Sequence, residues 1–158
     1  MALKIGDQLP EFELKNQNQE IISNDVFRNK IGVVYFYPKD NTPGCTAQAC
    51  TFRDAYQELI SNEVEVVGIS SDSSETHAIF SKKHNLPFHL LEDTNGKTRK
   101  KFGVPSNIFG LIPGRVTYVI DQKGTIRGII NTQLKINEHL KRVQELIEEL
   151  QGAEKSSK

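Results

Sequence analysis

The sequence predicts one α/β domain that has a mixed central β-sheet with helices on its faces. Three apolar runs of strand length are rich in β-branched and aromatic residues, which is typical of strands buried on both faces. These runs are residues 31–37, 63–70 and 115–121. A helical pattern over residues 46–61 joins the first two runs, and such a strand–helix–strand unit makes its two strands parallel. We assign residues 1–150 to this single domain and residues 151–158 to a polar tail.

The remaining elements are predicted from local signals in chain order. Residues 72–85 begin with Asp and Ser, which suit a helix N-cap, and end at an Asn, so they predict a second helix. Residues 88–91 form a short apolar run and predict a strand. Residues 121–124 separate two strand-like runs, which indicates a β-hairpin. Residues 136–150 place their aliphatic side chains on one face of an amphipathic helix.

The composition excludes several classes of protein. The chain has 158 residues, of which 37% are hydrophobic and 25% charged, so it can bury a core without disulfides or metal ions. Its 20 basic and 20 acidic residues cancel, so we expect neither nucleic acid nor a membrane as its partner. The N-terminal stretch MALKIGDQLPEF lacks the apolar core of a secretory signal. We therefore expect a cytoplasmic protein, whose thiols stay reduced unless they take part in chemistry.

The two cysteines of the chain are the first candidates for that chemistry. Cys45 lies at the expected first turn of a helix that follows a strand, where open α/β sheets place their sites. The amides and dipole of a helix N-terminus favour a thiolate there. A free cysteine has a pKa of about 8.5, and a dipole contributes at most about 2 kcal/mol, so we expect a cation to assist. Arg53 and Arg115 are the candidate cations.

Two other groups of residues have simpler interpretations. His77 and His84, taken with the cysteines, do not have the short spacings of a zinc site, and a metal-bound thiolate would be unavailable as a nucleophile. The basic run at residues 97–101 is typical of the solvated face of a short helix. The glycines of GLIPGR do not follow the phosphate-loop pattern. We therefore predict neither a metal nor a cofactor.

The segment PKDNTPGCTAQACTFRD resembles the active-site segment of the peroxiredoxins, in the bacterioferritin-comigratory-protein or peroxiredoxin Q subfamily. The family pattern is proline, three residues, threonine, two residues and cysteine, and Pro38, Thr42 and Cys45 match it. Cys50 matches the second cysteine, five residues further on. The resemblance continues through GISSDSSETHAIFSKKHNLPFHLLED and FGLIPGRVTYVID, over most of the chain.

This resemblance implies a thioredoxin-like fold and assigns roles to individual residues. It implies that Cys45 is the peroxidatic cysteine, that Cys50 is the resolving cysteine, and that the two form a disulfide. Arg115 matches the arginine that the family brings in from a later strand. The resemblance also implies peroxide substrates, a thioredoxin or similar dithiol reductant, and a monomer.

The chemistry of peroxide reduction gives the same residues their tasks. A peroxide needs a thiolate nucleophile, groups that hold its oxygens in line, and a positive charge for the departing oxygen. Cys45 can supply the thiolate, Thr42 can donate and accept hydrogen bonds, and Arg115 can supply the charge. We expect substrate contacts from Pro38, Thr42, Gly44, Cys45 and Arg115.

The predicted function is a thiol-dependent peroxidase that reduces hydrogen peroxide and organic hydroperoxides. One alternative is a general disulfide oxidoreductase on the same fold, which the lack of a Cys-x-x-Cys motif disfavours. The other alternative is a redox-sensing or chaperone-like protein whose cysteines report peroxide without turnover.

The spacing of the cysteines predicts a conformational change. Residues five apart in an ideal helix have Cα atoms roughly 8.7 Å apart, whereas a disulfide rarely tolerates more than about 7 Å. A bond between Cys45 and Cys50 therefore requires this helix to unwind. We expect Gln48 on the surface of the same helix, where it would affect contacts with partner proteins.

Overall fold

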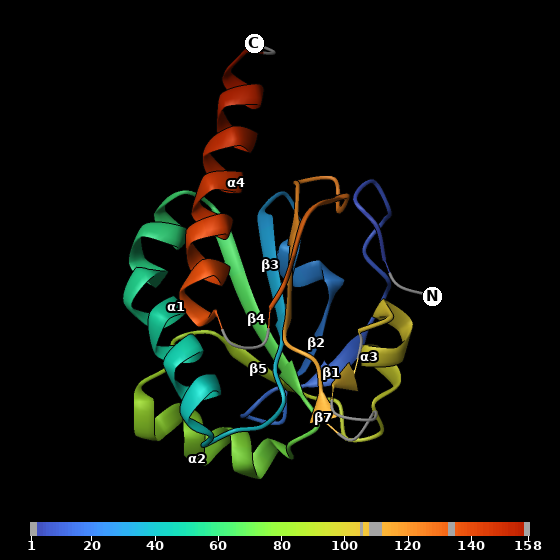
Figure 1. The fold of residues 1–158 in the computed structure, drawn as a ribbon, viewed down its shortest axis with the longest axis vertical. Coiled ribbons are helices and arrows are strands. Elements are labelled where there is room, and N and C mark those ends of the chain that lie inside the picture. The colour runs from blue at the N-terminus through green and yellow to red at the C-terminus, as the bar shows by residue number, and fades with distance from the viewer. Residues whose placement is uncertain (1–2, 105, 108–111, 133–134, 157–158) are drawn as a thin grey trace.

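A mixed five-stranded β-sheet forms the centre of the computed structural model, which describes residues 3–104, 106–107, 112–132 and 135–156. The strand order is β5-β4-β3-β8-β9 (Figure 1). The bounds are β3 (Ile31–Phe36), β4 (Val64–Ser70), β5 (His89–Glu92), β8 (Val116–Ile120) and β9 (Ile126–Asn131). The pairs β3–β4 and β4–β5 are parallel, whereas β8 is antiparallel to both β3 and β9. This arrangement confirms the predicted mixed sheet.

The burial of each strand follows its place in the sheet. All residues of β3 and β8 are buried, because these strands are covered on both faces. The edge strand β9 instead alternates between buried positions and more exposed ones. Asp121 and Gly124 form the turn between β8 and β9, and Gly124 has a φ of 80°, which glycine adopts without strain. The predicted hairpin is therefore present.

Three helices cover one face of the sheet (Figure 1). They are α1 (Pro43–Ser61), α2 (Ser74–His84) and α4 (Ile136–Ser156). Their buried side chains form one core cluster with β3, in which Phe52 of α1 and Phe80 of α2 are fully buried. α4 contributes Val143, Leu146 and Ile147, the apolar face that its sequence pattern predicts.

The other face of the sheet is covered by shorter elements. They are β1 (Glu13–Lys15), β2 (Ile21–Ser23), the 3₁₀-helix η1 (Asn24–Phe27) and α3 (Lys97–Phe102). β1 and β2 pair with each other, and Phe27 and Phe102 anchor a second core cluster against the sheet. A further two-stranded pair joins β6 (Ser106–Asn107) to β7 (Ile112–Pro113). No helix in the described part of the chain is long and apolar enough to cross a membrane.

The boundaries of two helices differ from those predicted. α1 begins at Pro43 rather than at residue 46, because proline fits the first helical position, where no amide donor is needed. α4 runs on to Ser156, so the polar end expected as a tail is helical in its described part. Gln151 supports this extension, since its side-chain amide donates to the carbonyl of Asn62 at 3.3 Å.

Candidate active site

The start of α1 places Cys45 at the carboxyl end of β3. Thr42 is the N-cap, with extended backbone angles (φ −89°, ψ 151°), and its carbonyl accepts the first helical hydrogen bond from the amide of Thr46 at 2.9 Å. The amides of Gly44 and Cys45 therefore lie in the first turn, where no intrahelical carbonyl can pair with them. The predicted position of Cys45 at the first turn of a helix is confirmed.

Arg115 contacts the sulfur of Cys45. Its Nη2 donates to Cys45 Sγ at 3.2 Å, and both residues are buried, with 4% and 1% of their surfaces exposed. Cys45 is a free thiol. A guanidinium held against a sulfur in a buried position can stabilise negative charge there, because the pair is shielded from water. Arg115 precedes β8, so the antiparallel pairing of β8 with β3 delivers this cation to the start of α1.

Gln48 is buried beneath this contact, which corrects our expectation that it lies on the helix surface. Its Oε1 accepts from Arg115 Nη1 at 2.6 Å, and it is 1% exposed. Gln48 follows Cys45 by three residues, so both side chains lie on the inner face of α1. The amide orients the guanidinium without adding a negative charge that would compete with the thiolate. Gln48 Nε2 has no hydrogen-bond partner among the described residues.

Gly44 allows Arg115 to come this close. A Cβ atom at position 44 would lie 3.1 Å from Arg115 Nη2 and 3.7 Å from Ile136 Cδ1. Such a contact with the guanidinium is tighter than ordinary van der Waals packing, so a side chain here would push Arg115 away from the sulfur.

The loop before α1 contributes Pro38 and Thr42, both of which are half-buried. The hydroxyl of Thr42 donates to the carbonyl of Lys39 at 2.9 Å and makes no side-chain cap bond to the helix. Since the donor is occupied, the lone pairs of this oxygen can accept a hydrogen bond from a bound molecule. Pro38, which has no amide donor, directly follows the buried Tyr37.

A buried polar network supports the same loop. Asp40 accepts from the hydroxyl of Tyr37 at 2.6 Å and pairs with His77 Nδ1 at 2.6 Å. His77 Nε2 lies 3.0 Å from the carbonyl of Leu91. Both ring nitrogens therefore face acceptors, which is the arrangement of an imidazolium paired with a carboxylate. The backbone amide of Asp40 donates to Asp72 at 2.8 Å.

The same polar network contains a group of potential metal ligands. Asp40, Asp72 and His77 hold potential ligand atoms within 4.8 Å of one another. Each of these groups already has a hydrogen-bond partner within the network, so the cluster is satisfied as a buried ion pair. His84 lies elsewhere, near Cys50, and the structure does not bring the two histidines to one site.

Cys50 lies deeper in α1 and is half-buried, also as a free thiol. Its Sγ is 3.9 Å from Nδ1 of His84, the last residue of α2. Arg53 Nη1 donates to the carbonyl of His84 at 2.8 Å, and its Nε pairs with Asp54 at 3.0 Å. Of the two candidate cations, Arg115 contacts Cys45 and Arg53 binds next to Cys50.

Tyr35 lies in the core beside both cysteines, and its ring stacks on Phe52 with centroids 5.1 Å apart. Its hydroxyl has no hydrogen-bond partner among the described residues. Burial raises the pKa of Tyr35 well above 10.0, and the charges of Asp40 and Cys45 raise it further. Tyr35 therefore stays neutral, and its ring forms an apolar wall behind the cysteines.

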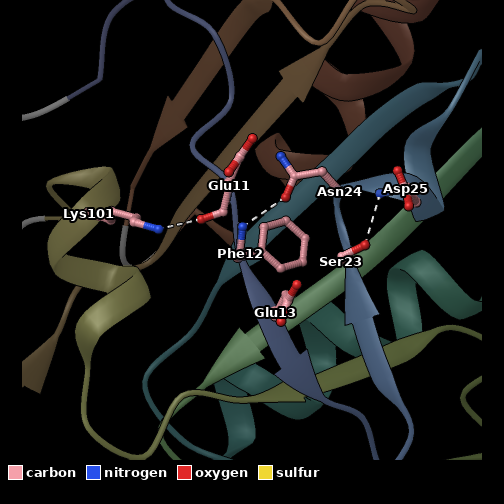
Figure 2. Close-up of a pocket in the computed structure, with 7 residues that line it drawn as sticks. All are labelled: Glu11, Phe12, Glu13, Ser23, Asn24, Asp25 and Lys101. Atoms are coloured by element: carbon pink, nitrogen blue, oxygen red, sulfur yellow. Dashed lines mark hydrogen bonds between the residues drawn. The ribbon is translucent and has the colours of Figure 1, made fainter.

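A surface recess of about 480 Å³ lies at a different part of the molecule (Figure 2). Its lining residues are Glu11, Phe12, Glu13, Ser23, Asn24, Asp25 and Lys101. Several of its polar groups bond to one another, as when the amide of Phe12 donates to Asn24 Oδ1 at 2.9 Å. None of the lining residues belongs to the predicted site, so the volume of a recess does not by itself identify the active site.

Sequence reasoning missed Gln48, Asp40, His77 and His84 as residues that support the cysteines. A helical-wheel argument could have found Gln48, because positions i and i+3 share a face. His77 and His84 belong to α2 and are brought near α1 by the packing of that helix, for which the sequence holds no local signal. Asp40 lies in the loop before α1, but its pairing with His77 depends on the same packing.

Known proteins resemble this chain over most of its length. A family model described as AhpC/TSA matches residues 5–129. Peroxiredoxin Q, chloroplastic, from Sedum lineare is 48% identical over 145 residues, which cover 92% of this chain and 78% of that protein. The protein of the same name from Populus jackii is 47% identical over 145 residues, covering 92% and 68%. The crystal structure of peroxidoxin BcpB from Mycobacterium tuberculosis matches with a TM-score of 0.87 and 30% identity, covering 94% of this chain and 99% of that one.

These relatives confirm the predicted thioredoxin-like fold but overturn the expected cytoplasmic location. Both curated relatives are named chloroplastic. Our expectation rested on a polar N-terminal stretch and on thiols kept reduced, and neither property distinguishes one reducing compartment from another.

Proposed function

Since this chain belongs to the AhpC/TSA family and is a thiol-dependent peroxidase of the peroxiredoxin Q type, we propose that Cys45 reduces the peroxide and Cys50 resolves the product. The observation that carries these assignments is the buried contact of Arg115 with the sulfur of Cys45 at 3.2 Å. Cys50 has a different environment, because it is half-buried and lies near a histidine. The two thiols are therefore suited to different tasks.

In the first step, the Cys45 thiolate attacks one oxygen of the peroxide. The O–O bond breaks, the sulfur becomes a sulfenic acid, and the departing oxygen takes up a proton as water or an alcohol. Arg115 faces the sulfur and can stabilise the negative charge as it moves to the departing oxygen. Thr42 can accept a hydrogen bond from the peroxide, since its own proton is directed at Lys39.

The shape of the site also follows from its residues. Gly44 leaves space beside the guanidinium. Pro38 restricts the backbone of the loop before α1. We propose that Pro38, Thr42, Gly44, Cys45 and Arg115 together bind the peroxide.

In the second step, Cys50 attacks the sulfenic acid and forms the Cys45–Cys50 disulfide. Because both residues are in α1, their Cα atoms lie roughly 8.7 Å apart in ideal geometry, which is too far for the bond. The first turns of α1 must therefore unwind. A bond that costs several helical hydrogen bonds, at about 0.5–1.5 kcal/mol each, is easily reduced, as suits a catalytic disulfide.

We further propose that thioredoxin or a similar dithiol protein reduces this disulfide, and that hydrogen peroxide and organic hydroperoxides are the substrates. Residues 1–150 would act as one thioredoxin-like domain and as a monomer. The names of the curated relatives support a peroxide substrate.

A coupled assay tests this proposal against its two alternatives. We expect the protein to consume hydrogen peroxide over many turnovers with thioredoxin, thioredoxin reductase and NADPH, and to reduce insulin disulfides poorly. Efficient insulin reduction without peroxide turnover would indicate a general disulfide oxidoreductase. A single equivalent of peroxide consumed, with no turnover in the presence of any dithiol reductant, would indicate a redox sensor.

A further inference from the structure

The contact between Cys50 and His84 joins two helices that the proposed function does not otherwise connect. Cys50 lies in α1 and His84 ends α2, and their Sγ and Nδ1 atoms are 3.9 Å apart. Both side chains are half-buried, so the contact is shielded but still reached by water. An imidazole beside a thiol is a common arrangement for activating the sulfur, because the ring can take up its proton.

The position of His84 is fixed by two independent contacts. Its ring packs edge-on against the fully buried Phe80, with centroids 5.0 Å apart and planes at 68°. Its carbonyl accepts from Arg53 Nη1 at 2.8 Å. Asn85 then ends α2 in the left-handed conformation (φ 53°), so His84 is the last residue of the helix. The imidazole is thus held in place against Cys50.

Cys50 needs such a partner more than Cys45 does. It lies inside α1, where the backbone amides are engaged in helical hydrogen bonds, so no free amide can stabilise its thiolate. A free cysteine is only a few per cent thiolate at neutral pH. The reaction with a sulfenic acid requires the thiolate, so an unassisted Cys50 would react slowly.

We propose that His84 is the general base that activates Cys50 for disulfide formation, an inference that rests on the proposed roles of the two cysteines. Neutral His84 takes the proton from the Cys50 thiol through Nδ1. The thiolate attacks the sulfur of the Cys45 sulfenic acid, an S–S bond forms, and the S–O bond breaks. The released hydroxide receives the proton from the imidazolium through solvent, so the products are the disulfide and water.

One charged pair lies beside this contact. Arg53 lies one turn beyond Cys50, and its pKa is raised chiefly by the hydrogen bond to Asp54, against the effect of burial, and also by the charge of Cys50. The bond of Arg53 to the carbonyl of His84 holds this guanidinium close to the contact, while Asp54 is paired with Arg53.

The same contacts set the direction of the conformational change. Arg53 and Cys50 are both tied to the end of α2, whereas Cys45 lies in the first turn of α1. We therefore expect the sulfenic acid of Cys45 to move towards Cys50, where His84 holds the resolving thiol until the two sulfurs meet.

The test measures sulfenic acid and disulfide separately after one equivalent of hydrogen peroxide. Sulfenic acid is trapped with dimedone, and the disulfide is followed by mass spectrometry, in wild type, His84→Ala and His84→Gln. His89→Ala is the matched control, because His89 is another half-buried histidine but contacts Asn16. We expect unchanged sulfenic acid formation in all four proteins, and disulfide formation slowed roughly ten- to thirtyfold at neutral pH in both His84 variants.

Two readouts separate a base from a structural contact. The deficit of the His84 variants should shrink as the pH rises and Cys50 ionises unaided, and added imidazole should restore the rate of His84→Ala. A disulfide rate equal to wild type, or a slow rate that neither pH nor imidazole changes, would overturn the proposal. Failure of wild type to form any sulfenic acid at Cys45 would instead contradict the proposed function.

Discussion

At the scale of single residues, Arg115 connects the side chain of Cys45 to that of Gln48. One guanidinium nitrogen faces the sulfur and another faces the amide of Gln48, so the arginine is held by two directed hydrogen bonds. Gln48 is neutral and leaves the positive charge available to the sulfur. Arg115 is buried, so water screens this charge little.

We expect Arg115→Met to impair Cys45 more than Arg53→Met does. Without the guanidinium, reaction with peroxide should slow by about a hundredfold, as when a charge-stabilising group is lost. Stopped-flow kinetics with hydrogen peroxide measure the rate of both variants. A larger loss of rate in Arg53→Met would reverse the assignment of the cation.

The two cysteines should differ in single-turnover experiments. Cys45→Ser should consume no peroxide, because the nucleophile is lost. Cys50→Ser should still consume about one equivalent and stop at the sulfenic acid, which dimedone traps. Equal loss of the first turnover in both variants would contradict the proposed division of tasks.

At the scale of secondary structure, α1 combines a weak first turn with a firmly held centre. Thr42 leaves the helix start without a side-chain cap, and Gly44 has a low helix propensity. Further along, Phe52 is fully buried and Arg53 is bonded to the end of α2. The helix is therefore easier to unwind before Cys50 than after it.

Amide hydrogen exchange should show this difference. On formation of the Cys45–Cys50 disulfide, protection of the hydrogen-bonded amides over residues 46–51 should fall sharply and return with a dithiol reductant. Protection beyond Phe52 should change little, because the core contact persists. Unchanged exchange in protein shown by mass to contain the disulfide would refute the unwinding of α1.

A buried histidine, His139, joins α4 to Thr117 of β8, which lies two residues after Arg115 in the chain. His139 Nδ1 lies 2.7 Å from the hydroxyl of Thr117, and its Nε2 lies 2.9 Å from the carbonyl of Thr132. The carbonyl requires a proton on Nε2, so Nδ1 accepts from the hydroxyl and the ring is neutral. Burial lowers the pKa of His139 below its ordinary 6.5; the carbonyl of Thr132 opposes this and the charge of Arg115 adds to it.

This histidine should make stability depend on pH. Below 6.5 the unfolded chain binds a proton at position 139 that the folded protein excludes. The free energy of unfolding therefore does not depend on the protonation of this histidine above pH 6.5. It decreases as the pH falls below 6.5, by at most about 1.4 kcal/mol per pH unit. Urea unfolding of wild type and His139→Gln at several pH values tests this. We expect a smaller decline in the variant, and an identical one would contradict the role of His139.

At the scale of the whole molecule, a polar network ties together the ends of three adjacent parallel strands. Asp40 follows β3, Asp72 follows β4, and the carbonyl of Leu91 belongs to β5. His77 at the start of α2 bonds to Asp40 and to this carbonyl. The network therefore holds the loop that carries Thr42 and Cys45 against the sheet.

Breaking the Asp40–His77 pair should destabilise the whole fold. Both side chains are fully buried, so Asp40→Asn or His77→Asn leaves an unmatched polar group, at a cost of about 3–5 kcal/mol. The double variant should lose less than the sum of the single losses, because the two residues share one interaction. Urea unfolding measures all three variants. Additive losses would show that the two residues do not interact. The same set of single and double variants of the exposed pair Arg142–Glu145 is the control.

The sequence by itself determined the elements whose signals are local. Apolar runs of strand length, helical periodicity and the turn at residues 121–124 identified the sheet, α1, α2, α4 and the β8–β9 hairpin. The short β1 and β2 were not predicted, because three-residue strands with exposed positions have no clear alternation. The spacing around Cys45 also identified the candidate nucleophile and its helix terminus.

Only the tertiary structure decided which side chains meet across the molecule. The argument from the helix terminus left both Arg115 and Arg53 as candidate cations, and only the family resemblance favoured Arg115. In the structure, the antiparallel pairing of β8 with β3 brings Arg115 to Cys45. The packing of α2 against α1 placed His84 beside Cys50. The physical reason is that these contacts join residues 34 and 70 positions apart along the chain, and their geometry depends on strand order and helix packing. Periodicity and spacing describe only neighbours within one element.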